Sequence, residues 1–356
     1  MSLLHRLFGR DDEDGARVPA MDGVFKPNAL LDGARRVVAL PGVDDLAVSG
    51  EALLATSGDT LHRVDPATGA AEAVRRFEGP LTMVAASPDG TIAVGIEGHG
   101  VMVGTLAGTW KAVDLPAPDR GCVVAGIFRD NEELLLAIGS TTHRRSDWKR
   151  DLISHGASGR LLSCRLLDGV PQVLADGIAF PHGVAVAGGR LVVAESWRHR
   201  LVGLPGGTRL LEDLPAYPAR LAPAGDGGLW LALFAPRRQL TEFVLREDDY
   251  RHAMMATIPQ EAWIGPDFGD GRGLTEPLQA GSVRQMGIMK PWAPSRSYGL
   301  VVRLDHDLRP VATFHSRADG GIHGITAIAE LGGRLYAASR GAGVIVALNA
   351  GTGGTA

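Results

Sequence analysis

The segment GVAVAGGRLVVAES at residues 183–196 joins two short apolar runs through a Gly–Gly turn. This pattern is typical of a β-hairpin. The same plan recurs as LAVSGEALLATS (46–57), VAASPDGTIAVG (84–95), VAGIFRDNEELLLAIG (124–139), RLAPAGDGGLWLALF (220–234) and ITAIAELGGRLYAAS (325–339). A lone hairpin cannot bury its own apolar face, so the hairpins must pack against one another. These six units predict an all-β, six-bladed β-propeller with a shared pocket on its axis.

Two stretches interrupt the strand pattern. In blade three, SDWKRDLISHG within 140–159 offers Ser146 as a helix N-cap and Gly156 as a terminator, which predicts one short helix. In blade five, apolar residues at helical spacing within 241–264 predict a helical segment. One interpretation packs this segment on the propeller face, and the other makes it a lid over the pocket.

These patterns divide the chain into three parts. We expect a partly disordered N-terminal arm at 1–36, a single propeller at 37–350 with a lid-like insertion at about 240–292, and a flexible tail at 351–356. Ring closure normally borrows a strand from the other terminus, so part of 24–40 is expected to pair with the last blade.

The composition narrows the class of protein. The 356 residues carry a net charge of −4, which indicates no nucleic-acid footprint, and 45% of them are hydrophobic, as in ordinary globular proteins. Cys122 and Cys164 are too few for a disulfide framework. The first residues lack the pattern of a secretory signal, and no apolar run approaches the length of a membrane span. We therefore expect a soluble, cytoplasmic protein without a membrane span.

Several segments in this order resemble the strictosidine synthase-like family. They are 140–162, DGIAFPHGVAVAGGRLVVAES (176–196), EDLPAYPARLAPAGDGGLWLAL (212–233), SYGLVVRLDHD (297–307) and ITAIAELGGRLYAAS (325–339), and the likeness runs over about 40–350. The family belongs to a superfamily of six-bladed propellers with gluconolactonases, paraoxonase-type lactonases and organophosphate hydrolases.

The resemblance implies a divalent cation, usually calcium, at the axis of the superfamily's hydrolases. The implied ligands are an acidic residue in blade one, the Asn of a P-N-G motif and the Asp or Asn of a Y-P-D-N-like motif. Blade one offers Asp44 and Asp45, but the other two motifs read Pro181-His182-Gly183 and Tyr217-Pro218-Ala219-Arg220. Because a guanidinium repels a cation, we predict no metal and no cofactor, with a calcium site as the alternative.

The same substitutions suggest a different chemistry at the axis. If Arg220 and His182 point inward, with Asp44 orienting Arg220, the site suits a carboxylate, a phosphate or the oxyanion formed when an ester is attacked. His182 is then the candidate base, and His323 is expected to face the same funnel. We predict catalytic roles for His182, Asp44 and His323, against the alternative that each inner-strand residue is structural.

Five further residues are predicted to bind substrate: Arg220, Tyr217, Thr326, Trp292 and Trp148. Thr326 stands where the resemblance to the plant synthases implies a glutamate, which argues against their condensation reaction.

Three functions follow. The first is hydrolysis of a small ester or lactone, with a carboxylate-bearing substrate among the candidates. The second is a non-catalytic propeller that binds a small anion or a protein, and the third is a lyase or condensing enzyme of the strictosidine synthase type.

Overall fold

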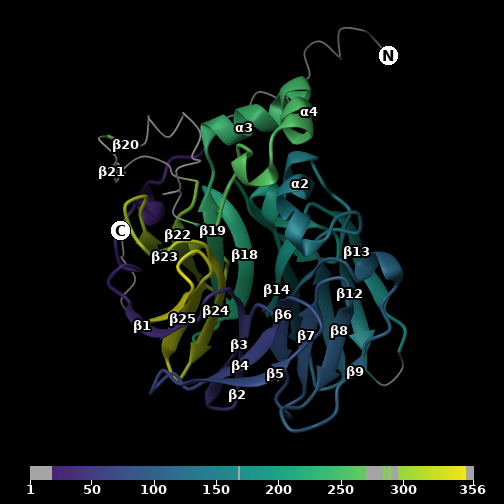
Figure 1. The fold of residues 1–356 in the computed structure, drawn as a ribbon. Helices are drawn as coiled ribbons and strands as arrows, with labels where there is room; N and C mark the ends of the chain where they lie inside the picture. Colours follow the sequence, from purple (N-terminus) through teal and green to yellow (C-terminus); the bar gives the residue numbers. More distant parts are fainter. Residues whose placement is uncertain (1–17, 167–168, 270–283, 286–287, 290–295, 350–356) are drawn as a thin grey trace.

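The computed structural model describes residues 18–166, 169–269, 284–285, 288–289 and 296–349. Within these ranges, six four-stranded antiparallel sheets surround a central axis, so the chain is the six-bladed β-propeller that the hairpins predict (Figure 1). In the part of the chain that is described, no helix is long and apolar enough to cross a membrane.

The strands of each blade run outward from the axis in chain order. Blade one contains β2 (Val43–Ser49), β3 (Ala52–Ser57), β4 (Thr60–Val64) and β5 (Ala71–Arg76), and blade two contains β6 (Leu81–Ala86), β7 (Ile92–Ile96), β8 (Gly100–Gly104) and β9 (Lys111–Ala112). Blade three contains β10 (Val123–Phe128), β11 (Glu133–Ile138), β12 (Gly159–Arg165) and β13 (Gln172–Ile178), and blade four contains β14 (Pro181–Ala187), β15 (Arg190–Glu195), β16 (Arg200–Leu204) and β17 (Thr208–Leu211). Blade five contains β18 (Ala216–Pro223), β19 (Leu229–Pro236), β22 (Gly299–Leu304) and β23 (Pro310–Ser316).

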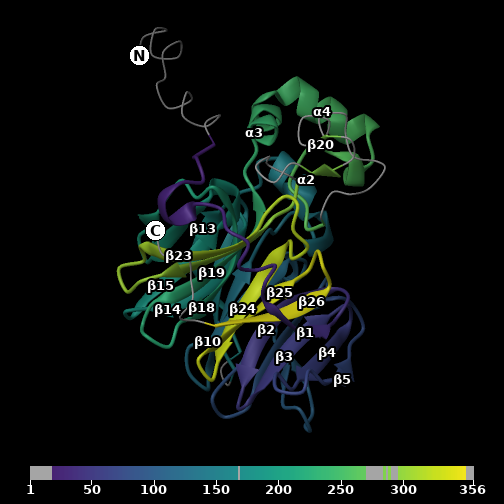
Figure 2. The same cartoon turned by 90° about the vertical axis from the view of Figure 1, so that its left-hand side faces the viewer.

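Blade six closes the ring with a strand from each end of the chain. From the axis outward it contains β24 (Ile325–Leu331), β25 (Arg334–Ser339) and β26 (Val344–Asn349). On the outside, β1 (Arg35–Ala39) pairs antiparallel with β26 (Figure 2). The pairing expected from 24–40 is therefore present. Before β1, Leu31 donates its backbone N–H to the carbonyl of His315 in β23, so the arm also runs along blade five.

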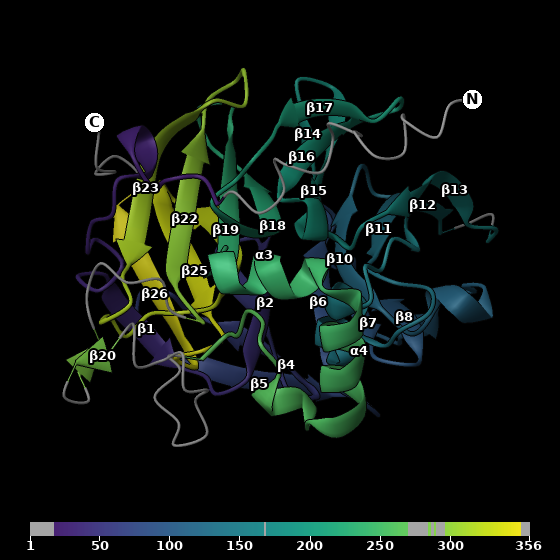
Figure 3. The ribbon, with the colours of Figure 1, turned by 90° about the horizontal axis from the view of Figure 1, so that it is seen from above.

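The helices lie mainly on one face, which we call the upper face. Blade three contributes η3 (Arg145–Asp147) and α2 (Trp148–Ile153), and blade five contributes α3 (Gln239–Arg246), α4 (Asp248–Thr257) and η5 (Gln260–Ala262). Figure 3 shows α3 and α4 across this face. The remaining short elements are η1 (Gly23–Phe25), η2 (Ala117–Asp119), η4 (Ser196–Arg198), β20 (Arg284–Gln285) and β21 (Ile288–Met289).

The insertions differ in detail from the sequence pattern. The blade-three helix begins at Trp148 after a 3₁₀ turn, and no side chain caps it, so Ser146 is not its N-cap. The blade-five segment forms two helices, because Glu247 between α3 and α4 has a non-helical ψ of 84°.

A truncation tests the ring closure. Removing residues 1–39 deletes β1, which buries Val37 and completes the ladder on β26. We expect the free energy of unfolding to fall by at least about 3 kcal/mol, from two lost valines and their backbone hydrogen bonds. Removing only residues 1–34 leaves β1 in place but also takes away the buried Leu31, so it is the matched control for the loss of β1 itself. Equal stability of the two truncations in urea unfolding would contradict the closure.

Candidate functional site at the propeller axis

Every inner strand carries a register irregularity near its start. The pairing of inner and second strands shifts between Val43 and Leu46, Leu81 and Met83, Val123 and Ala125, Pro181 and Gly183, Pro218 and Leu221, and Ile325 and Ala327. A bulge leaves an extra residue outside the ladder and re-aims it. The extra residues are Asp44 and Asp45, Thr82, Val124, His182, Ala219 and Arg220, and Thr326, which form one ring around the axis.

Arg220 occupies the centre of this ring and is almost fully buried. Its Nη1 donates to the carbonyls of Asp44 (2.8 Å) and Thr326 (3.2 Å), and its Nη2 donates to the carbonyl of Thr82 (2.7 Å) and to Asp44 Oδ2 (2.9 Å). Its Nε donates to the carbonyl of Val124 at 3.1 Å and lies 3.2 Å from Asp45 Oδ1. All five N–H donors of the guanidinium therefore have acceptors, so Arg220 links its own blade five to blades one, two, three and six.

Blade four joins this centre through its backbone. A Cβ on Gly183 would lie 2.4 Å from the Ala219 carbonyl oxygen and 2.8 Å from the Cα of Arg220. Glycine is therefore needed after His182, because it lets β14 approach the strand that carries Arg220.

The residues at this centre do not fit a calcium ion. Calcium takes several oxygen ligands, and the four carbonyls and two carboxylates that would supply them already accept from Arg220. Within the described ranges, no group of three or more His, Cys, Asp or Glu side chains is placed to hold a metal. The guanidinium thus stands where the resemblance implies an ion.

Asp44 faces the upper side of Arg220 and is held by two further cations. Its Oδ1 accepts from Arg145 Nη2 at 3.2 Å and from Arg340 Nη1 at 2.6 Å, while Oδ2 accepts from Arg220. Burial alone would raise the pKa of Asp44, but the three guanidinium groups outweigh it and hold the pKa well below its usual range. Asp44 and Asp45 together balance two of these three guanidinium charges, so the upper side, where Arg145 and Arg340 lie, keeps an excess positive charge.

Asp45 has a different environment. Its Oδ1 accepts from the backbone N–H of Leu46 at 2.8 Å, and its Oδ2 accepts from that of Val84 at 2.8 Å. Burial raises the pKa of Asp45 to about 6, against the opposing charge of Arg220. Asp45 also lines a cavity on the lower side of Arg220, and Asp44 does not. The carboxylates of the adjacent residues Asp44 and Asp45 therefore lie on opposite sides of Arg220, Asp44 on the upper side and Asp45 on the lower side.

His182 is buried on the axis, and neither of its ring nitrogens has a hydrogen-bond partner among the residues that the structure describes. Its ring packs edge-on against Phe180 and Phe234, at centroid distances of 5.5 and 5.7 Å. Burial and the charges of Arg145 and Arg220 lower the pKa of His182 well below its ordinary value. The imidazole is therefore neutral at pH 7, with an acceptor nitrogen for a ligand or a water molecule.

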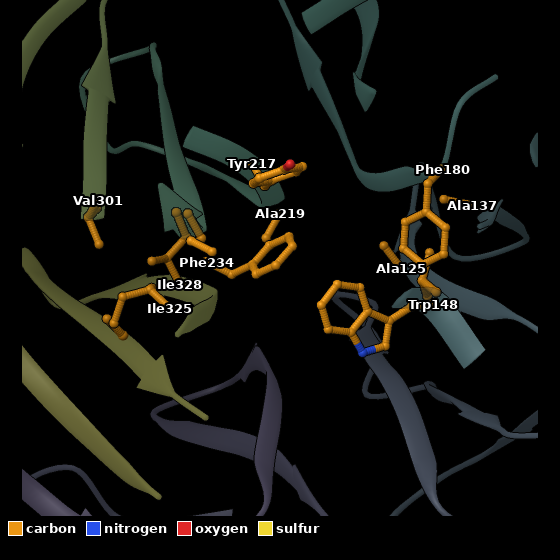
Figure 4. Packing of buried hydrophobic residues seen from close by; sticks show 14 of the residues in the cluster. Ala125, Ala137, Trp148, Phe180, Tyr217, Ala219, Phe234, Val301, Ile325 and Ile328 are labelled. Carbon is orange, nitrogen blue, oxygen red and sulfur yellow. The ribbon is translucent and has the colours of Figure 1, made fainter. Parts of the chain in front are cut away.

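Aromatic rings enclose the upper side of the site. Trp148 of α2 lies edge-on to Phe234 of β19 at 5.6 Å and to Phe268 at 5.2 Å, and Phe268 lies 5.1 Å from Phe234. Figure 4 shows Trp148, Phe234 and Tyr217 facing the same central space from different elements. Phe268 also covers two of the cations, because the guanidinium carbons of Arg340 and Arg145 lie 4.7 and 6.0 Å from its ring centroid.

The structure places the other predicted residues as follows. Thr326 Oγ1 donates to the carbonyl of Asp44 at 2.6 Å. Tyr217 is buried beside Phe234, and its hydroxyl has no hydrogen-bond partner within the described ranges. His323 Nε2 donates to the carbonyl of Arg317 at 2.7 Å, and its Nδ1 accepts from Ser297 Oγ at 2.9 Å. Trp292 lies outside the described residues. The roles of all these residues stay predictions.

The sequence pattern did not single out Arg340 and Phe268. Arg145 was visible only as part of an insertion at the pocket. Arg340 follows β25 directly, where an inner hairpin returns to the upper face. Phe268 lies in the Gly-rich stretch 265–273, and its carbonyl oxygen would lie 2.6 and 1.9 Å from a Cβ on Gly324 and Gly341. The close approach of Phe268 to these two glycines depends on tertiary packing, so it has no local sequence signature.

Comparisons with known proteins agree with the fold. A family model for the NHL repeat matches residues 179–204. The adipocyte plasma membrane-associated protein of Homo sapiens is 24% identical over 249 residues, 60% of this chain and 59% of that protein. The protein of the same name from Rattus norvegicus is 26% identical over 246 residues, 60% and 65% of the two chains. This chain therefore spans less than two thirds of the length of these curated relatives.

Solved structures of six-bladed propellers are similar over most of the chain. A calcium-binding protein, regucalcin from Agrobacterium tumefaciens, superposes with a TM-score of 0.57 at 12% identity and covers 88% of this chain and 92% of its own. A luciferin-regenerating enzyme gives a TM-score of 0.55 at 12% identity, with 92% and 96% covered. A protein provisionally assigned as a gluconolactonase gives 0.53 at 9% identity, with 89% and 91% covered. These likenesses show the gluconolactonase- and regucalcin-type propeller fold, and the narrower strictosidine synthase-like resemblance stays a prediction.

Replacing Arg220 tests its place at the axis. In Arg220→Met, Asp44 and Asp45 lose their shared partner inside the protein, so we expect the free energy of unfolding to fall by about 3–5 kcal/mol. In Arg220→Ala, the freed oxygens form a cradle for a cation, so millimolar calcium should raise the melting temperature of this variant and not that of the wild type. The exposed Arg76→Met is the control. A calcium-stabilised wild type would contradict the assignment.

His182 makes stability depend on pH. Its pKa is lowered below 6.5 in the folded state, so the unfolded chain takes up a proton first as pH falls through 6.5. Stability is therefore lost on the acid side, by at most about 2 kcal/mol at pH 5. His182→Gln removes this contribution and leaves that of the buried His199 and His315, whose pKa values are also lowered, whereas His306→Gln, at an exposed site, keeps the full dependence. Urea unfolding at pH 8 and pH 5 measures the difference, and parallel behaviour of wild type and His182→Gln would refute it.

Proposed function

We propose that this propeller hydrolyses a small ester or lactone at its upper axial site, without a metal ion. The observation that carries the proposal is His182, a neutral imidazole that has no hydrogen-bond partner among the described residues and is buried beside an excess of guanidinium groups. Support also comes from the fold shared with the luciferin-regenerating enzyme and with the protein provisionally assigned as a gluconolactonase.

The role that we assign to each residue follows from its unused hydrogen-bonding groups and its exposure. Arg220 has no unused donor, so its role is to hold Asp44 and the ring of carbonyls in place. Arg145 is buried, and its Nε has no partner in the described part of the chain, which leaves a cationic donor for an oxyanion or a carboxylate. Arg340 is the most exposed of the three arginines and stands at the entrance. His182 accepts a proton from the attacking water, and Asp44 keeps Arg145 and Arg340 oriented.

The aromatic enclosure of the site favours a second function, binding of a small anion without catalysis. Trp148, Phe234 and Phe268 close around the upper side, and His182 is almost fully buried beneath them. A propeller that holds a small anion without transforming it would show the same charges and the same enclosure. A condensing reaction of the strictosidine synthase type stays a third prediction, and Thr326 supplies no carboxylate for it.

Hydrolysis of aryl esters and lactones separates the first two functions. We expect His182→Gln to lower kcat/KM by a factor of about 10² to 10⁴, the usual contribution of a general base. His315→Gln, at a buried histidine of blade five that contacts Tyr298, is the matched control and should keep the wild-type rate. Equal rates in His182→Gln and wild type would remove His182 as the base.

Binding of benzoate identifies the alternative. If no ester or lactone is hydrolysed but benzoate binds to the wild type and more weakly to Arg145→Met, the site binds anions without catalysis. If benzoate binds equally to both, the upper arginines do not form an anion site.

A further inference from the structure

The central tunnel has a second compartment below Arg220. A cavity of about 470 Å³ lies there, lined by the later residues of all six inner strands, among them Ala47, Ala86, Ile127 and Ile328. Arg220 and Asp45 form its inner end. Because the guanidinium bonds to blades one, two, three and six, it separates this cavity from the upper site. The volume falls within the range of small-molecule pockets.

The inner end of this cavity offers hydrogen-bond acceptors rather than donors. All five N–H groups of Arg220 are used by Asp44, Asp45 and the four carbonyls. Asp45 Oδ2 accepts only from the Val84 N–H among the described residues, so it has a lone pair to spare. A carboxylate with spare acceptor capacity at the end of a tunnel favours a ligand that donates hydrogen bonds.

The walls and the rim add to this preference. Ala47, Ala86 and Ile127 are only partly buried, so apolar surface faces the cavity. At the rim, Arg129 pairs with Glu133 at 3.0 Å, which offsets its charge, and Glu330 contributes a second carboxylate to the lining. The charge of Arg220 is shared by Asp44 and Asp45. The compartment therefore combines apolar walls with acidic groups.

We propose that the lower compartment binds a small organic amine, with its protonated nitrogen donating to Asp45 and its apolar body against the inner strands. This site has the opposite charge preference from the upper one, and it does not depend on the proposed hydrolysis. The chemistry of the walls defines the ligand class as a primary amine on a compact apolar group, such as a ring or a short branched chain.

Benzylamine is the probe, followed by chemical shifts of the backbone amides of Val84, Gly126 and Ala185, which line the cavity. We expect saturable shifts in the wild type and an affinity at least about tenfold weaker in Asp45→Asn, the effect of losing one charge-assisted hydrogen bond. Ala86→Phe fills the cavity and should abolish binding without touching Asp45. Ala112→Phe, on the exposed strand β9, is the matched control and should bind like wild type.

Two more measurements distinguish this site from the upper one. Saturating benzoate should not displace benzylamine, and Arg145→Met should bind benzylamine like wild type. Lowering the pH from 7 to 5 should weaken the amine's affinity, because burial raises the pKa of Asp45 to about 6 and the protonated carboxyl carries no charge. The charged groups facing Asp45 are Arg220 and Asp44, and Arg129 and Glu330 line the same cavity.

Binding that is lost in Ala86→Phe and weakened in Asp45→Asn supports the proposal. No saturable shift with benzylamine, equal binding by Asp45→Asn, Ala86→Phe and wild type, or displacement by benzoate overturns it. Failure of ester hydrolysis leaves it standing, because that reaction concerns His182 and Arg145.

Discussion

A buried guanidinium holds the centre of this propeller together. Six inner strands bulge near their starts, and bulges release carbonyls from the sheet ladders. Buried carbonyls without donors are unfavourable, and six strand edges that converge on one axis concentrate them. Arg220 provides five donors in a rigid plane, so one side chain satisfies four carbonyls and two carboxylates.

The same side chain gives the tunnel two halves with different chemistry. Above it, Asp44 accepts hydrogen bonds from Arg145 and Arg340, and the positive charges around Asp44 hold its pKa far below its usual range. Below it, Arg220 is the one cation that Asp45 meets among the described residues, and burial raises the pKa of Asp45 to about 6. Adjacent residues in one bulge thus create an electropositive compartment and an acidic one. A metal ion bound by both carboxylates would not produce this separation.

Much of the fold was predictable because the hairpins repeat. The alternation in 183–196 and its five counterparts predicts the number of blades, and the strand expected from 24–40 is β1. The two helices in 239–257 were harder to predict, since their break at Glu247 depends on how the segment packs. Ser146 resembled an N-cap by composition, but the preceding 3₁₀ turn places Asp147 before the helix.

The site was less predictable, because its members meet only through tertiary structure. Arg220 and His182 could be placed on inner strands from the two motifs that contain them, although the saturation of Arg220 depends on bulges in four other blades. Arg340 and Phe268 reach the axis through close backbone approach at Gly324 and Gly341. The most direct test is hydrogen exchange of the Arg220 guanidinium by NMR, with Arg220→Lys to assign its resonances. We expect resolved Nη protons in slow exchange that stay unchanged in excess calcium, whereas rapid exchange or displacement by calcium would contradict the central place of Arg220.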